Sequence, residues 1–112
     1  AAAAAYATSL DVGDCRAYPS IEAMVADPAI DAIWLTGPNH ARIENVRAIV
    51  ETIRAGRGTL RGLACEKPLA RTVREAEEVA AMAASVGLAT GYLENQLFAP
   101  QVEAGHQLLW AR

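Results

Sequence analysis

Short apolar runs alternate along the chain with segments in which apolar residues recur every three or four positions. The runs lie at residues 31–36, 63–65 and 88–93, and glycine, proline or charged residues follow each of them. Apolar runs of this length, bounded by turn residues, are typical of buried strands. The pattern therefore predicts three strands with a helix in each of the two intervals between them.

The first of these helices follows Asn39, which can cap it, and Gly56 stops it. Its apolar stripe consists of Ile43, Val46, Val50 and Ile53. The second helix opens with Thr72-Val73-Arg74-Glu75, a capping box in which the Thr72 and Glu75 side chains satisfy each other's backbone N–H groups. It ends at Gly87, and we expect it to present to the core Val73, Ala76, Val79, Ala80, Ala83 and Val86.

The two ends of the chain carry weaker patterns. Residues 2–10 read as the tail of a helix, residues 11–14 as a turn around Gly13, and residues 16–18 as a short edge strand. Ser20 is placed to cap a helix that runs to about Ala26. Pro100 suits the first turn of a final helix.

Strand, helix, strand, helix, strand in this order is the signature of an α/β fold with a parallel sheet. Strands of such sheets are covered on both faces, and ligands bind outside their carboxyl ends. Polar groups follow all three predicted strands, at residues 36–40, 66–68 and 94–96. Because these ends meet at one edge of the sheet, we interpret the convergence as a ligand crevice rather than as the ordinary polarity of loops.

Lys67 is the one lysine among the ten lysine and arginine residues of the chain. It follows the second strand in Cys65-Glu66-Lys67-Pro68, and Pro68 must end that strand because it lacks an N–H donor. An ammonium group can contact a hydroxyl or exchange a proton with it in ways that a guanidinium cannot. The alternative is a solvated surface charge in an arginine-biased chain.

Composition limits the class of protein. The chain has 112 residues, 53% hydrophobic and 21% charged, which indicates one small globular domain. A net charge of −3 with interspersed signs argues against nucleic acid and anionic lipid as partners, and no apolar run is long enough for a membrane span. Cys15 and Cys65 have no metal-ligand spacing, so we expect no metal site, a buried Cys65 and a reducing, cytoplasmic setting.

Residues 31–40 together with residues 65–70 resemble the glucose-fructose oxidoreductase, inositol dehydrogenase and rhizopine catabolism (Gfo/Idh/MocA) family. The pair formed by Pro38-Asn39 and Glu66-Lys67-Pro68 carries the resemblance, which runs from about Tyr18 to Pro100. It implies a Rossmann-like doubly wound parallel sheet that binds NAD or NADP. It also implies hydride transfer to or from a sugar, cyclitol or related hydroxy compound, and a dimer or tetramer formed through a C-terminal α/β domain.

The resemblance also implies roles for single residues. Lys67 would be the catalytic lysine, meeting the nicotinamide ribose and the substrate hydroxyl. Glu66 would line the nicotinamide side, and the peptide before Pro68 would be cis. The cofactor's ribose and pyrophosphate would be bordered by Thr36, Pro38, Asn39 and His40. Asn95 matches the asparagine of the family segment Asn-x-Arg-Phe-x-Pro.

The sequence departs from the family pattern at two places in these motifs. Leu97 stands where the family usually has arginine, and Arg42 stands where it often has histidine. His106 falls too early to be the family's catalytic histidine, so we interpret it as a surface or packing residue.

The glycine-rich Gly-x-Gly-x-x-Gly loop and the strand that would carry it are absent. We therefore expect residues 1–98 to be a partial dinucleotide-binding domain, residues 99–112 to begin a linking helix, and the chain alone to be inactive. A non-catalytic dinucleotide-binding sensor of the same fold is the alternative.

Overall fold

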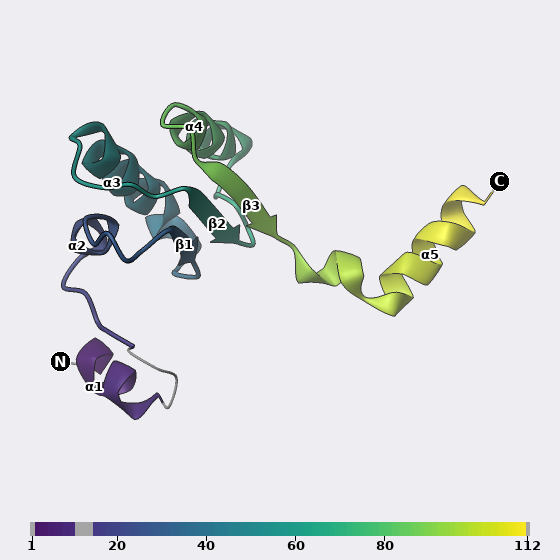
Figure 1. Ribbon diagram of the computed structural model, residues 1–112. Helices are drawn as coiled ribbons and strands as arrows, with labels where there is room; N and C mark the ends of the chain where they lie inside the picture. Colours follow the sequence, from purple (N-terminus) through teal and green to yellow (C-terminus); the bar gives the residue numbers. More distant parts are fainter. Residues whose placement is uncertain (1, 11–14, 112) are drawn as a thin grey trace.

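A three-stranded parallel sheet organises the computed structural model, which describes residues 2–10 and 15–111 (Figure 1). Its strands are β1 (Ala32–Leu35), β2 (Gly62–Glu66) and β3 (Ala89–Leu93), in the order β1-β2-β3. Leu35 lies beside Cys65, and Cys65 lies beside Tyr92. The structure thus confirms the three predicted strands and their parallel arrangement, which is that of a partial Rossmann-like α/β fold.

Helices α3 (Arg42–Arg54) and α4 (Val73–Ala84) pack against each other on one face of the sheet (Figure 1). Alternate strand residues point into this layer, so Ile33, Leu35, Leu63 and Cys65 are buried while their neighbours are not. Helix α3 supplies the deepest core residues, which are Val46, Ile49 and Val50. Gly56 and Gly87 follow the two helices with φ of +69° and +72°, as expected of residues that end helices.

The opposite face of the sheet is open in the described part of the chain. Trp34 is 59% exposed on it, and small residues such as Ala32, Ala64 and Gly91 lie on the same face. The prediction that the third strand is buried is wrong, because residues 89–92 of β3 are all exposed. The apolar run at residues 88–93 was typical of a strand covered on both faces, but no neighbouring strand pairs with the outer edge of β3 among the described residues.

The segment before β1 differs from prediction. Residues 16–18 form no strand, and residues 11–14, where a turn was predicted, lie outside the described residues. Instead the Arg16 guanidinium lies 2.9 Å from the Asp27 carboxylate, and the Tyr18 hydroxyl donates to the same oxygen at 2.7 Å. These polar contacts, and not strand pairing, hold the segment to the end of α2 (Ile21–Val25). Helix α1 (Ala2–Ser9) precedes them.

The caps of the helices agree with the sequence in part. Ser20 caps α2, and Thr72 accepts the N–H of Glu75 at 3.2 Å to cap α4, both as predicted. The predicted return hydrogen bond from the Thr72 N–H to Glu75 is wrong, because the Glu75 carboxylate instead accepts from the backbone N–H and the guanidinium of Arg71. Asn39 caps no helix; it begins a 3₁₀ turn, η1 (Asn39–Ala41), that leads into α3.

The stripe predicted for α4 is narrower than expected. Val79 and Ala83 are buried, whereas Val73 is 76% exposed and Ala80 is also exposed. Val73 is exposed because it is the first residue of α4 and does not pack on the sheet. The end of α4 that lies over β3 is only partly covered.

The chain leaves the sheet after β3. A second 3₁₀ turn, η2 (Asn95–Phe98), precedes α5 (Pro100–Trp110), which begins at Pro100 as predicted and extends away from the sheet (Figure 1). Phe98 and Trp110 are largely exposed, and so is His106, whose ring lies 6.1 Å from that of Trp110. No helix among the described residues is long and apolar enough to cross a membrane. The proposed division at residues 98 and 99 stays a prediction.

Candidate functional site

The polar segments that follow β1 and β2 meet at one edge of the sheet. Leu35 pairs with Cys65, and Glu66 pairs with Leu93, so the chain emerges from all three strands at nearly the same level. Residues 36–40 and 66–68 are consequently neighbours, although more than twenty residues separate them in the sequence. This is the arrangement predicted for two of the three polar segments.

Arg42 joins the two segments. It is the first residue of α3 and only 2% exposed. Its guanidinium donates to the main-chain carbonyl of Gly37 at 3.1 Å, after β1, and to the carbonyls of Glu66 and, at 3.4 Å, Pro68, after β2. The last two carbonyls lie on either side of Lys67 in the chain. Arg42 therefore holds the backbone of the predicted site together.

Sequence reasoning treated Arg42 as a departure from a family pattern and not as part of the site. A signal was nevertheless present. The amino end of a helix carries a partial positive charge, so an arginine there is disfavoured unless something else binds it. An arginine in the first turn of a predicted helix, just past a strand end, was the residue to question.

Lys67 is exposed at this edge, and none of the hydrogen bonds or ion pairs within residues 2–10 and 15–111 involves its side chain. The Lys67–Pro68 peptide is cis, which confirms the expectation from the family resemblance. Glu66 is half-buried as the last residue of β2, with its carbonyl bound by Arg42. The ammonium of Lys67 is thus presented to solvent from a main chain that is fixed on both sides.

Asn39 supplies an unsatisfied acceptor near this edge. Its Oδ1 atom is buried, and no donor within the described residues reaches it. Buried polar atoms nearly always have a partner, so this oxygen fits a hydroxyl or amide donor of a ligand such as a dinucleotide ribose or carboxamide. Thr36, Pro38 and His40 are exposed around it. These polar groups at the carboxyl edge therefore fit a ligand that carries hydrogen-bond donors.

Asn95 is placed less closely. It begins η2 beyond β3 and is exposed, and the Glu94 carboxylate accepts the N–H of Gln96 at 3.3 Å in this turn. The described contacts do not tie Asn95 to Asn39 or Lys67. The structure thus brings together the segments that follow β1 and β2, whereas Asn95 lies in η2, where the chain extends away from the sheet.

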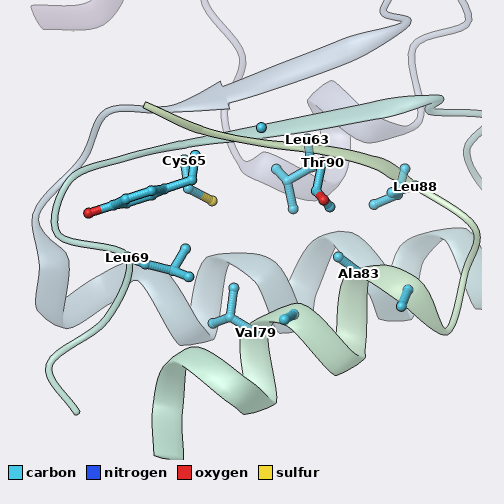
Figure 2. A pocket seen from close by; sticks show the side chains of 11 residues that line it. Leu63, Cys65, Leu69, Val79, Ala83, Leu88 and Thr90 are labelled. Carbon is cyan, nitrogen blue, oxygen red and sulfur yellow. The ribbon is translucent and has the colours of Figure 1, made fainter. Parts of the chain in front are cut away.

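A separate apolar cavity of about 160 Å³ lies between α4 and the strands β2 and β3 (Figure 2). Leu63, Cys65, Leu69, Val79, Ala83, Leu88 and Thr90 point into it (Figure 2). Its lining offers few polar partners, so it does not suit a dinucleotide. Burial raises the pKa of the Cys65 thiol, and the nearby Arg42 guanidinium opposes that rise.

Histidine, cysteine and carboxylate side chains do not gather in groups of three or more that could hold a metal ion anywhere in the described ranges. The side chains at the sheet edge offer the Lys67 ammonium, the Asn39 amide and the Glu66 carboxylate, together with the Thr36 hydroxyl and the His40 imidazole.

Comparison with known proteins identifies the family to which this site belongs. Residues 1–92 match the model of the Gfo/Idh/MocA oxidoreductase family with an NAD-binding Rossmann fold. Because the match covers most of the chain, the chain belongs to this family of oxidoreductases. The expected fold and the expected nicotinamide cofactor class agree with it.

Individual relatives are similar over part of their length. A 1,5-anhydro-D-fructose reductase from Ensifer adhaerens is 38% identical over 88 residues, which are 79% of this chain and 24% of that protein. An NAD-binding oxidoreductase from Klebsiella pneumoniae has a TM-score of 0.62 at 29% identity, over 83% of this chain and 23% of that one. Myo-inositol 2-dehydrogenase from Lactobacillus plantarum has a TM-score of 0.62 at 19% identity, over 82% and 25%, and shares the fold. The chain thus spans about a quarter of the length of these proteins.

Proposed function

We propose that the whole protein to which this chain belongs transfers a hydride between NAD or NADP and a sugar, cyclitol or related hydroxy compound. The observation that carries the proposal is the position of Lys67, an exposed ammonium at the carboxyl edge of the sheet in an NAD-binding oxidoreductase family. The sugar class is supported by the name of the relative from Ensifer adhaerens, which is a reductase of 1,5-anhydro-D-fructose.

In this proposal the nicotinamide ring gives or takes the hydride when the cofactor is bound. Lys67 stabilises the negative charge that develops on the substrate oxygen, because a fixed ammonium interacts more strongly with an alkoxide-like oxygen than with a hydroxyl. Asn39 borders the cofactor with its amide group, whose Oδ1 atom has no donor among the described residues. Thr36, Pro38, His40, Glu66, Pro68 and Asn95 border the cofactor, and the general base lies outside this chain.

The test begins with the complete protein and both reduced cofactors. NADH and NADPH are titrated separately, and energy transfer from tryptophan to the nicotinamide reports binding; FAD serves as a control ligand. Saturable binding of one of the two reduced cofactors is expected, followed by its oxidation when keto sugars are supplied. Omitting either the sugar or the protein should abolish that oxidation.

The outcomes separate the two hypotheses carried from the sequence. Binding together with turnover supports the oxidoreductase. Saturable binding without turnover, on keto sugars with the reduced cofactor and on polyols with the oxidised one, favours the non-catalytic sensor. Failure to bind either reduced cofactor contradicts the proposed dinucleotide site.

A further inference from the structure

Arg42 occupies a position that is unfavourable for its charge on three counts. It is only 2% exposed, and burial of a guanidinium is unfavourable unless the group is well paired. It lies at the amino end of α3, where the helix dipole repels a cation. Among the described residues it has no carboxylate within ion-pair distance.

The hydrogen bonds of Arg42 show what offsets this cost. They bind three main-chain carbonyl oxygens, those of Gly37, Glu66 and Pro68. A charged donor to a carbonyl is stronger than a neutral one, and the planar guanidinium can serve acceptors in different directions at once. The three acceptors lie at the end of β2 and in the segments that follow β1 and β2, which carry the candidate site. The hydrogen bonds that offset the burial of Arg42 therefore also fix the backbone geometry of that site.

The two acceptors after β2 flank Lys67. One guanidinium nitrogen of Arg42, Nη1, donates to the carbonyl before Lys67 and to the carbonyl after Pro68. The other terminal nitrogen donates to Gly37, so the same group anchors both segments to each other. Because no hydrogen bond or ion pair within the described part of the chain holds the Lys67 side chain, its position depends on the backbone that Arg42 holds.

We propose that Arg42 is a positioning residue for the reaction and acts through Lys67. This inference rests on the proposed function, in which Lys67 contacts the reacting hydroxyl. A displacement of about 1 Å at a reacting centre can cost about 10²-fold in rate. Loss of the guanidinium lowers kcat through misplacement of the ammonium, while the binding of cofactor and substrate changes less.

The test is a double-mutant cycle on the complete protein, with variants Arg42→Ala, Lys67→Ala and the combination. Arg42→Ala is expected to lower kcat by about 10- to 100-fold in the wild-type background and by less than about twofold in the Lys67→Ala background, because the residue acts through Lys67. Arg47→Ala is the matched control: Arg47 lies on the same helix, and its partners Glu44 and Glu78 are exposed. That variant should keep wild-type kcat.

Arg42→Lys keeps the charge and guards against a folding failure of the alanine variant. The three N–H donors of a lysine ammonium diverge from one nitrogen, whereas Arg42 uses two separate nitrogens to reach the two segments, so lysine cannot reproduce its hydrogen bonds. It should therefore also lower kcat, and should remain without further effect when Lys67 is absent. Hydrogen exchange supplies a readout that does not depend on activity: amides of residues 66–70 should exchange faster in both Arg42 variants and unchanged in Arg47→Ala.

The outcomes distinguish a failure of the role inferred for Arg42 from a failure of the role proposed for Lys67. Unchanged exchange and unchanged kcat in the Arg42 variants overturn the proposal. Equal loss of kcat with and without Lys67 overturns it as well, since the effect would then not pass through that residue. If Lys67→Ala alone keeps full activity, the lysine assignment of the proposed function fails, and faster exchange in the Arg42 variants leaves Arg42 with a structural role only.

Discussion

Replacement of Lys67 by alanine separates transition-state stabilisation from binding and from folding. The side chain is exposed, and no partner for it is found within the described residues. Its removal should therefore change the free energy of unfolding by less than about 0.5 kcal/mol. If its ammonium faces the reacting oxygen, kcat should fall by about 10² to 10³, or roughly 3–4 kcal/mol, by analogy with the loss of one oxyanion donor.

The binding of cofactor should respond much less. A hydrogen bond between the ammonium and a ribose hydroxyl contributes about 1.5–3 kcal/mol at most, and an exposed one less, so the dissociation constant should rise by no more than about tenfold. Steady-state kinetics on the complete protein give kcat, and the tryptophan-to-nicotinamide titration gives the dissociation constant. The expected signature is a fall in kcat that exceeds the loss of affinity.

Arg61→Ala is a suitable control for Lys67→Ala. Arg61 directly precedes β2 at the opposite end of the strand from Lys67, and its side chain is 79% exposed in an ion pair of 3.6 Å with Asp31. Its removal should leave kcat unchanged. Wild-type kcat in Lys67→Ala, with cofactor affinity also unchanged, would refute the reasoning, because no other role for the ammonium would then remain at this edge.

Three further predictions concern stability in the complete protein. Val46→Ala should cost about 2 kcal/mol or more, because the side chain is fully buried, whereas the same change at Val73, which is 76% exposed, should stay within about 0.5 kcal/mol; chemical denaturation measures both. Thr72→Ala should lower the free energy of unfolding by about 1 kcal/mol through loss of the α4 cap, whereas Thr72→Ser should retain most of the stability that the cap provides. The pKa of Asp27 is lowered, chiefly by the hydrogen bond that its carboxylate accepts from the N–H of Ala29. The ionised carboxylate therefore stabilises the fold above its unfolded pKa, and this stabilisation is lost as pH falls through the folded pKa. Thermal unfolding should accordingly show a stability advantage over Asp27→Asn near neutral pH that shrinks in acid.

The elements of the fold were open to prediction because they depend on local pattern. Apolar runs and helical periodicity located the strands and helices, and Ser20, Thr72 and Pro100 lie at the helix starts where a hydroxyl or a proline is favoured. The wrong predictions concern features that depend on contacts with neighbouring elements. Asn39 has the side chain of a cap, yet the 3₁₀ turn before α3 leaves its oxygen without a protein partner among the described residues.

Burial was predicted less well for the same reason. An apolar run at residues 88–93 indicates a strand, but whether that strand is covered depends on elements on both sides of the sheet. In the described chain α3 and α4 cover one face, and the small residues of the other face remain exposed. Val73 shows the same limit within a helix, since it fits the apolar period and still lies beyond the reach of the sheet.

The sequence by itself determined that this is a parallel α/β chain whose polar residues gather at the carboxyl ends of its strands, because strand and helix periods and the direction of parallel strands follow from local order. Only the tertiary structure decided what holds those residues in place. The hydrogen bonds from Arg42 to Glu66 and Pro68 join residues that are 24 and 26 positions apart. Contacts over such separations depend on how the strands and α3 pack together, and no local pattern of residues encodes them.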